Sequence, residues 1–254
     1  MSLQQSDRCC AEGVKVLLLA AGLGTRLRPL TDHTPKCLVE IAGRPLLDYW
    51  FDCFAEAGLH RILVNNHHIP DKVRRYIERL KQTTDLQVRE TFEPTLLGSA
   101  GTITANRAFA DDAEEVIIIY ADNLTDIDLR NLLFFHRSHS DPLTMVLFHT
   151  RHPSKCGIAE LDKECRIISF VEKPARPKSN LANAGIYVTN AEMFYRIADM
   201  NAFDIAFDVL PNFIGQMRGW MWTGYFRDVG TIEAVEEAKR DVPRFFGHSS
   251  RLTR

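Results

Sequence analysis

The sequence predicts an α/β fold in which buried strands alternate with helices that cross over between them. Short, nearly continuous apolar runs are typical of buried parallel strands, and they occur at residues 14–19, 61–65 and 116–120. Apolar residues recur at helical spacing at residues 46–57, 71–81 and 100–109. This alternation predicts a parallel sheet with crossover helices.

The next elements continue this alternation, and after them the expected secondary structure is mostly strand. Residues 128–139 have apolar side chains at helical spacing, and the apolar residues 143–149 return to a strand. From residue 156 onward β-rich segments dominate, with strands expected at residues 157–160, 166–171 and 184–188. A charged amphipathic helix is expected at residues 233–242. The second half is therefore expected to complete the sheet.

Length and composition limit the possible classes of protein. With 254 residues, 45% of them hydrophobic, the chain can bury one large core. We expect one domain over residues 13–242, with halves at 13–150 and 151–242, a flexible N-terminus at 1–12 and a C-terminal tail at 243–254. The net charge of -2 lacks the basic excess of a nucleic-acid-binding protein. No signal core, membrane span or Cys-x-x-Cys pair is present, so we expect a reduced, cytoplasmic protein without nucleic-acid or membrane partners.

A loop with two glycines directly follows the first expected strand. It reads Ala20-Ala21-Gly22-Leu23-Gly24-Thr25-Arg26-Leu27-Arg28-Pro29-Leu30 and is completed by Pro35-Lys36. The carboxyl end of a parallel strand is where α/β sheets bind ligands. Glycines let backbone N–H groups approach phosphate oxygens, and Arg26 and Lys36 add positive charge. This glycine loop, residues 20–30, therefore predicts the binding of a nucleoside triphosphate.

Other interpretations of the glycine loop are weaker. A lysine-terminated P-loop requires Gly-Lys-Ser/Thr after the glycines, and that sequence is missing. The dinucleotide fingerprint requires a third glycine where Leu27 stands, which argues against an NAD-dependent dehydrogenase. A plain turn between a strand and a helix would explain the glycines but not the basic residues that accompany them.

Two aspartates are candidate magnesium ligands. Asp122 follows the apolar run 116–120, so it is expected at a strand's carboxyl end on the same sheet edge as the glycine loop. Asp228 stands just before an expected helix start near Thr231. Magnesium that is bound to triphosphate oxygens and waters needs only one or two protein carboxylates. Alone, each aspartate would be better explained as a turn or capping residue, but their occurrence with the glycine loop favours a metal site.

Another expected strand ends at Glu172-Lys173-Pro174, where the chain enters a proline-restricted loop. In a ligand pocket Lys173 would hold an acceptor phosphate, and Glu172 would accept hydrogen bonds from sugar hydroxyls. The alternative is a solvated surface pair. Asn183 and Gly185 would add an amide for hydroxyl recognition and a close backbone approach, unless Gly185 is only a strand-edge glycine.

A run of small residues after a strand-like segment at 86–92 suits one wall of a base-binding site. It includes Leu97, Gly98 and Ser99 and leads into a helix. Glu93, just before this run, could accept two hydrogen bonds from guanine N1–H and the exocyclic amine. A partly exposed loop glutamate remains the alternative at that position.

On these residues the chain resembles the sugar-1-phosphate nucleotidyltransferases, also called nucleotide-sugar pyrophosphorylases, over most of residues 14–240. The resemblance rests on the glycine loop with Pro35-Lys36, followed in order by Leu97-Gly98-Ser99-Ala100-Gly101, Asp122, Glu172-Lys173-Pro174, Asn183-x-Gly185 and Asp228-x-Gly230. Glu93 and the Leu-Gly-Ser-Ala-Gly run make it most similar to mannose-1-phosphate guanylyltransferases. The resemblance implies a Rossmann-like, mixed and mostly parallel sheet of the glycosyltransferase-A type, and a requirement for Mg2+.

The implied reaction transfers a nucleotidyl group from an NTP to a sugar 1-phosphate, giving an NDP-sugar and pyrophosphate. Catalytic roles are expected for Arg26, Lys36 and Lys173, and metal binding is expected at Asp122 and Asp228. The residues expected to contact the nucleotide are Ala20, Ala21, Gly22, Gly24, Thr25, Glu93, Leu97, Gly98 and Ser99. Those expected to contact the sugar phosphate are Asp122, Gly157, Glu172, Lys173, Asn183 and Gly185.

The expected substrates are GTP and mannose 1-phosphate or a related sugar phosphate. A thymidylyl- or uridylyltransferase acting on glucose 1-phosphate or an amino-sugar 1-phosphate remains an alternative, because these branches share the catalytic loop. A non-catalytic sugar-nucleotide sensor is the alternative of another class, and a homo-oligomer is compatible with each of these functions.

Overall fold

The computed structural model describes residues 11–246, so residues 1–10 of the predicted N-terminus and 247–254 of the predicted tail lie outside it. The described residues form two compact units whose segments interleave along the chain. Unit 1 comprises residues 11–96, 120–129 and 224–246, and unit 2 comprises the remainder. The predicted halves are contiguous in sequence, whereas these units are not.

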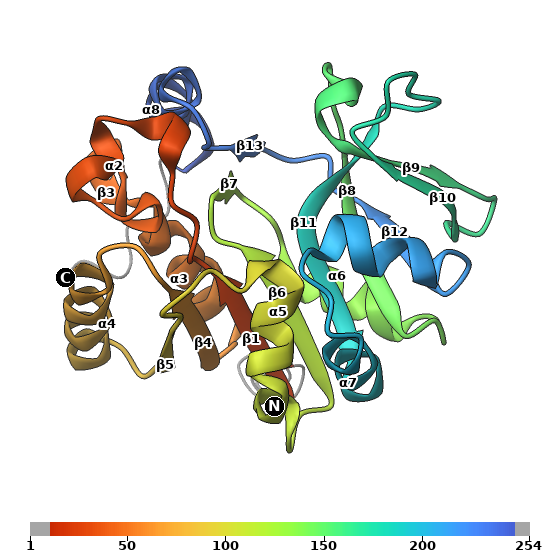
Figure 1. Ribbon diagram of the computed structural model, residues 1–254, viewed down its shortest axis with the longest axis horizontal. Coiled ribbons are helices and arrows are strands. Elements are labelled where there is room, and N and C mark those ends of the chain that lie inside the picture. The colour runs from red at the N-terminus through yellow and green to blue at the C-terminus, as the bar shows by residue number, and fades with distance from the viewer. Residues whose placement is uncertain (1–10, 247–254) are drawn as a thin grey trace, which may run out of the picture. The chain divides into compact units, whose positions relative to one another are not determined.

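Unit 1 contains three parallel strands that lie side by side in Figure 1, with β4 between β1 and β5. Their bounds are Val14–Leu19 for β1, Arg61–Asn66 for β4 and Gln87–Phe92 for β5. β1 and β4 are buried along nearly their whole length, as their apolar sequences predict. The crossover helices are α3 (Leu46–Ala57), which has the predicted bounds, and α4 (Pro70–Thr83).

The shorter elements of unit 1 close its core. They are helix α2 (Leu30–His33), the hairpin of β2 (Glu40–Ile41) and β3 (Arg44–Pro45), and the antiparallel pair of β7 (Asn123–Thr125) and β13 (Phe226–Asp228). Helix α8 (Ile232–Phe245) completes the unit.

The predicted end of the last helix at residue 242 is wrong, because α8 continues through Pro243 to Phe245. The rings of Phe245 and Tyr225 lie 4.7 Å apart, and those of Phe246 and Tyr49 lie 5.2 Å apart. Contact of Phe245 and Phe246 with the buried Tyr225 and Tyr49 stabilises the last turn enough to keep a proline inside the helix. Residues 243–246 therefore belong to the folded unit and not to a tail.

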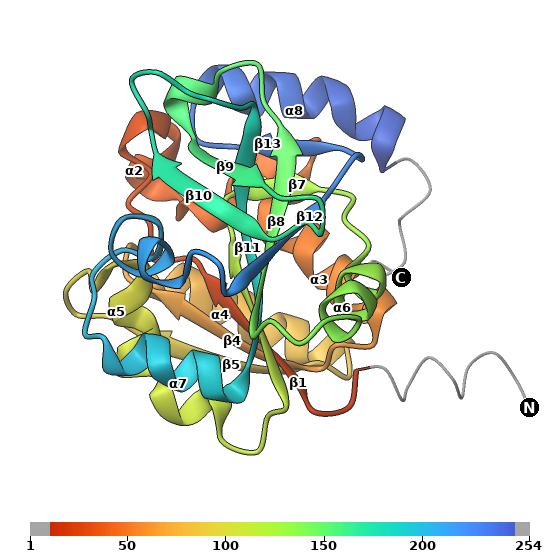
Figure 2. The same cartoon turned by 90° about the vertical axis from the view of Figure 1, so that its right-hand side faces the viewer.

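Unit 2 is built around β11 (Leu181–Asn190), which is longer than the expected strand at 184–188. β11 forms antiparallel pairs with β6, β8 and β9. β9 continues into a hairpin with β10, and β12 is parallel to β8 (Figure 2). The bounds are Glu115–Tyr120 for β6, Leu143–His149 for β8, Gly157–Leu161 for β9, Ile167–Glu172 for β10 and Met217–Met221 for β12.

The helices of unit 2 are α5 (Gly98–Ala105), α6 (Leu129–Arg137) and α7 (Ala191–Asp199). α7 packs against α5 and was not predicted, although Asn190 caps it by accepting a hydrogen bond from Met193 N–H. The predicted helix at 100–109 is shorter at its C-terminus and gives way to a 3-10 turn. Among residues 11–246, no helix combines the length and apolar character needed to cross a membrane.

Candidate functional site

The two glycines of the glycine loop have different surroundings in unit 1. Gly24 has a φ of 64°, and a Cβ there would lie 2.8 Å from Thr31 Cγ2 and 3.1 Å from Lys36 Cβ. The Thr31 hydroxyl donates a hydrogen bond of 2.7 Å to the Gly24 carbonyl. Around Gly22, a Cβ would meet no atom within 4 Å beyond the adjoining residues. Gly24 therefore lets the loop pack closely against Thr31 and Lys36. Gly22 borders open space that a phosphate group can enter.

Buried Asn65, at the end of β4, links the glycine loop to Glu93 and is absent from the predicted site residues. Asn65 Oδ1 accepts a hydrogen bond of 2.6 Å from Ala20 N–H, and Asn65 Nδ2 donates one of 2.7 Å to Glu93 Oε1. Glu93 is 2% exposed, so the alternative of a partly exposed loop glutamate is wrong. One carboxylate oxygen of Glu93 braces the loop, and the contact of Glu93 with a guanine base stays a prediction.

Lys36 and Asp122 form an ion pair near the start of the glycine loop. Lys36 Nζ lies 2.5 Å from Asp122 Oδ2, and Lys36 is almost completely buried. The backbone next to Asp122 is fixed, because Ala121 donates its N–H to Leu19 O at 3.0 Å. The Asp122 side chain is 33% exposed. The lysine therefore orients the carboxylate without closing it off from a ligand.

β13 places Asp228 close to Asp122 and Arg26. The backbone after Asp228 is tied to Asp122, because Val229 donates its N–H to Asp122 O at 2.8 Å. A Cβ at Gly230 would lie 2.7 Å from Asp228 Oδ1 and 2.8 Å from Arg26 Nη2. The ends of both side chains therefore lie over Gly230, and a Cβ at that position would displace them.

The oxygen donors of unit 1 suit Mg2+. No cluster of three or more His, Cys, Asp or Glu ligands occurs among residues 11–246. Mg2+ that binds together with a substrate needs only one or two protein carboxylates, because waters and phosphate oxygens complete its octahedron. Asp122 and Asp228 fit such a shell, and Arg26 beside them complements the charge of the phosphates.

In unit 2, the predicted residues Gly157, Glu172 and Lys173 come together at one end of the β9–β10 hairpin. Lys173 has a φ of 48°, which side chains rarely adopt, and its N–H donates to Cys156 O at 3.0 Å. Lys173 Nζ lies 3.7 Å from Glu172 Oε1. Burial raises the pKa of Glu172, and Gly157 lies opposite it, where a Cβ would collide with Glu172 Oε2. A strained, exposed lysine beside a mostly buried carboxylate is typical of a binding site.

Asn183 and Gly185 form an irregular bend in β11. Asn183 Nδ2 donates to the Tyr187 hydroxyl at 2.7 Å, and Asn183 Oδ1 accepts from Gly185 N–H at 2.9 Å. Gly185 has a φ of 67°, and the pairing register with β8 shifts between Asn183 and Tyr187. The Asn183 amide therefore holds a β-bulge, and its contact with a sugar hydroxyl stays a prediction.

The turn at Gly98 and Ser99 is anchored to a segment that was not predicted. Gly98 has a φ of 78°, and a Cβ there would collide with the Phe203 carbonyl oxygen. The Ser99 hydroxyl donates to Asp204 Oδ2 at 3.2 Å and accepts from Ile205 N–H at 2.9 Å. Ser99 thus has a structural role in unit 2, and its contact with a nucleotide, like that of Leu97, stays a prediction.

Replacing Gly98 with alanine is expected to lower the free energy of unfolding by about 2–4 kcal/mol, because strain at positive φ adds to a backbone collision. Gly215→Ala is the matched control: its φ is 82°, but a Cβ there would meet no atom within 4 Å. The control should lose about 1 kcal/mol from strain alone. Urea unfolding of both variants measures the difference, and equal losses would contradict the packing of Phe203 on Gly98.

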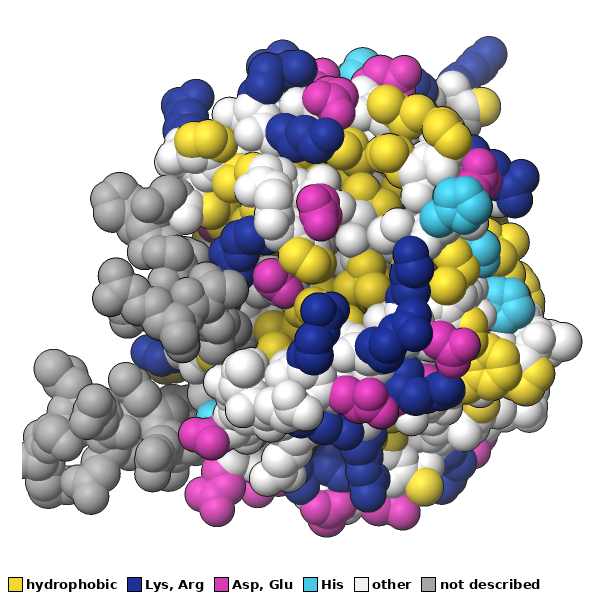
Figure 3. Space-filling model, turned by 90° about the vertical axis from the view of Figure 1, so that its left-hand side faces the viewer, with side chains coloured by type: hydrophobic (Ala, Val, Ile, Leu, Met, Phe, Trp, Pro, Cys, Tyr) yellow, Lys and Arg dark blue, Asp and Glu magenta, His cyan; other side chains and the backbone are white. Residues whose placement is uncertain are grey.

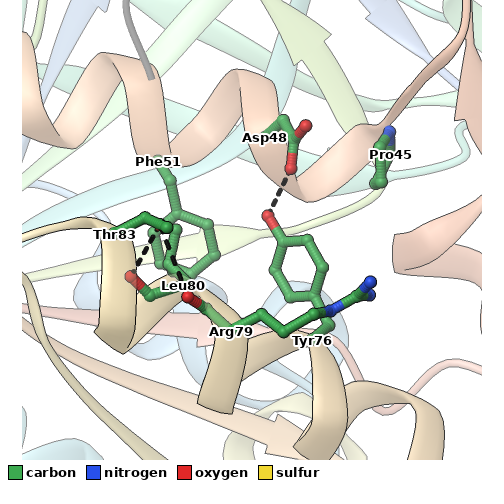
Figure 4. A pocket seen from close by; sticks show the side chains of 7 residues that line it. All are labelled: Pro45, Asp48, Phe51, Tyr76, Arg79, Leu80 and Thr83. Carbon is green, nitrogen blue, oxygen red and sulfur yellow. Dashed lines mark hydrogen bonds between the residues drawn. The ribbon is translucent and has the colours of Figure 1, made fainter. Parts of the chain in front are cut away.

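A hollow of about 280 Å³ between α3 and α4 contains none of the predicted site residues (Figure 4). There the Tyr76 hydroxyl donates to Asp48 Oδ1 at 2.5 Å, and Arg79 extends along the hollow. Figure 3 shows Lys and Arg side chains gathered on one face, with Asp and Glu side chains among them. Lys72, Arg75 and Arg79 of α4 line a second hollow together with Glu78. The predicted chemistry, however, lies around the glycine loop.

Comparisons with known proteins agree with this arrangement. A family model described as nucleotidyl transferase matches residues 15–244. The chain is 30% identical over 221 residues to mannose-1-phosphate guanylyltransferase catalytic subunit beta of Drosophila pseudoobscura pseudoobscura, covering 86% of this chain and 59% of that protein. It is 31% identical over 222 residues to mannose-1-phosphate guanyltransferase of Aspergillus oryzae, covering 85% and 61%. The chain thus spans about three fifths of the length of these relatives.

Among solved structures, the chain is similar to one from Bacillus anthracis that is provisionally named a glucose-1-phosphate thymidylyltransferase and was solved in complex with sucrose. The TM-score is 0.79 at 22% identity, covering 89% of this chain and 94% of that one. This likeness confirms the predicted α/β fold with a mixed central sheet. Since the family model covers nearly all the described residues, the chain belongs to the nucleotidyl transferase family.

Proposed function

We propose that this chain transfers a nucleotidyl group from GTP to mannose 1-phosphate and releases pyrophosphate. The main support is the set of charged side chains gathered around the glycine loop in unit 1: Arg26, Lys36, Asp122 and Asp228. Family membership supports the reaction class, and the names of the two relatives support the substrates. A requirement for Mg2+, a cytoplasmic location and homo-oligomeric assembly belong to the same proposal.

In the proposed reaction, a phosphate oxygen of the sugar phosphate attacks the α-phosphorus in line, and the bond to the leaving pyrophosphate breaks. No covalent protein intermediate is needed, so the protein's contribution is positioning and charge neutralisation. Arg26 and the N–H groups of the glycine loop hold the leaving pyrophosphate. Asp122 and Asp228 would hold Mg2+, which would neutralise phosphate charge.

The lysines orient the groups that react. Lys36 keeps Asp122 in its orientation through their 2.5 Å ion pair and adds positive charge for the attacking phosphate. Lys173 holds the acceptor phosphate, and the neighbouring Glu172 accepts hydrogen bonds from the sugar hydroxyls. Both ends of the acceptor are therefore recognised from the end of one strand, β10.

Two other functions remain candidates. The name of the Bacillus anthracis structure favours thymidylyl transfer to glucose 1-phosphate, and uridylyl transfer to an amino-sugar 1-phosphate uses the same chemistry. A sugar-nucleotide sensor would keep the ligand sites without turnover. The four charged residues around the glycine loop favour an enzyme, because a sensor has no need to neutralise a leaving pyrophosphate.

The test is pyrophosphate release with Mg2+ across a matrix of GTP, dTTP, UTP, CTP and ATP against mannose, glucose, N-acetylglucosamine and heptose 1-phosphates. We expect the highest kcat/KM with GTP and mannose 1-phosphate. A dTTP or UTP optimum would move the assignment to another branch of the family. Nucleotide-induced thermal stabilisation without pyrophosphate release from any pair would favour the sensor.

A further inference from the structure

Two exposed phenylalanines of unit 2 lie on one short turn. Phe203 is 62% exposed and Phe207 is 58% exposed, and they flank the start of the π-helical turn Ile205–Val209. Neighbouring large apolar side chains that are exposed indicate a binding surface more often than a single exposed apolar side chain does. We call Phe203 and Phe207 the aromatic pair.

Hydrogen bonds at both ends fix the backbone that bears the aromatic pair. Asp204 Oδ1 accepts from the N–H groups of Ala206 and Phe207 at 2.8 and 3.0 Å. Asp208 Oδ2 accepts from the N–H groups of Phe203 and Asp204 at 3.2 and 2.8 Å. The rings are therefore exposed on a preorganised turn, which lowers the entropy that binding a ligand would cost.

Contacts place the aromatic pair among predicted site residues. Lys173 Nζ lies 5.8 Å from the centroid of the Phe207 ring, within cation–π range. Phe203 packs on Gly98, because a Cβ at Gly98 would lie 2.9 Å from atoms of the Phe203 ring. Ser99 ties the same turn to α5 through its hydroxyl. The aromatic pair therefore lies next to both Lys173, which is expected to hold the acceptor phosphate, and the turn at Gly98.

We propose that the aromatic pair binds the apolar face of the acceptor's sugar ring while Lys173 holds its phosphate. One face of a pyranose presents C–H groups that pack on an aromatic ring, and its hydroxyls point outward, where the Glu172 carboxylate can accept hydrogen bonds. Such a combination of aromatic surface and a few polar groups is typical of small-molecule sites. This inference rests on the proposed function and adds residues that select the sugar.

The test compares Phe207→Ala and Phe203→Ala with Phe134→Ala, whose side chain is 77% exposed on α6. Loss of one aromatic contact is expected to raise the KM for mannose 1-phosphate about tenfold, with the KM for GTP unchanged. Phe207→Tyr should restore the KM, because the ring face is kept. Phe134→Ala should behave like the unaltered chain.

A binding measurement separates this inference from the proposed reaction. By calorimetry, mannose 1-phosphate should bind the unaltered chain more tightly than inorganic phosphate, and Phe207→Ala should remove most of that difference. If no NTP releases pyrophosphate but this binding difference persists, the reaction is wrong and the aromatic site stands. Unchanged KM and affinity in both alanine variants would overturn the inference. So would an altered sedimentation coefficient with unchanged KM, which would identify the pair as a self-association surface.

Discussion

Replacing Arg26 with alanine is expected to lower kcat/KM for pyrophosphate release about a thousandfold while leaving the fold intact. The guanidinium lies over Gly230 beside Asp228, and Arg26 is exposed, so its charge is available to a phosphate group. In the alanine variant, no guanidinium would stabilise the negative charge that develops on the leaving pyrophosphate. Because the interaction strengthens as the bond breaks, kcat should fall more than the affinity for the NTP.

Arg74→Ala is the matched control for charge and exposure. Arg74 lies on α4 of the same unit and forms surface pairs with Asp71 and Glu90 at 3.0 and 3.2 Å. Exposed pairs of this kind contribute at most about 1 kcal/mol to stability, so the control should keep both its activity and its melting temperature. Normal turnover by Arg26→Ala, under conditions where Arg74→Ala is also normal, would remove Arg26 from the mechanism.

Features of the site that depend on a strand end could be predicted from sequence. The apolar run of β1 locates the glycine loop, and the run of β6 locates Asp122, because buried strands have a strong local signal. The Glu172-Lys173 pair follows from the end of β10 in the same way. The bounds of α3 were also predictable, since its apolar residues recur at helical spacing and Gly58 ends it in the left-handed conformation.

Features that depend on contacts distant in sequence could not be predicted. Asn65 becomes a brace only because β4 brings it between Ala20 and Glu93, and no local pattern distinguishes it from another polar residue at a strand end. The Phe203–Phe207 turn is anchored to Ser99, more than a hundred residues earlier, whose hydroxyl accepts from Ile205 N–H and donates to Asp204 Oδ2. The extension of α8 past Pro243 likewise follows from aromatic packing on distant tyrosines, which overrides the local preference.

Acidification below pH 6.5 is expected to destabilise the fold through His136 by up to about 3 kcal/mol. His136 lies on α6 and is 6% exposed, with Nδ1 at 2.8 Å from Thr144 Oγ1. Burial, with smaller contributions from His139 and Arg137, lowers the pKa of His136 from 6.5 to about 4. The folded chain therefore keeps His136 neutral at a pH where the unfolded chain protonates it. Stability is lost as the pH falls from 6.5 to about 4, and below that this group has no further effect.

Urea unfolding of His136→Gln tests this effect, with the exposed His149→Gln on β8 as the control. Between about pH 7 and about pH 4.5, the unaltered chain and the control should lose about 2.5 kcal/mol more than His136→Gln. Burial also lowers the pKa of His139, but that side chain is present in all three proteins, so its contribution largely cancels in the comparison. Equal losses in all three would mean that the folded chain accepts the proton at His136. That result would contradict a neutral His136 imidazole bonded to Thr144. A protonated His136, buried beside His139 and Arg137, would need a negatively charged partner, which the neutral ring does not need.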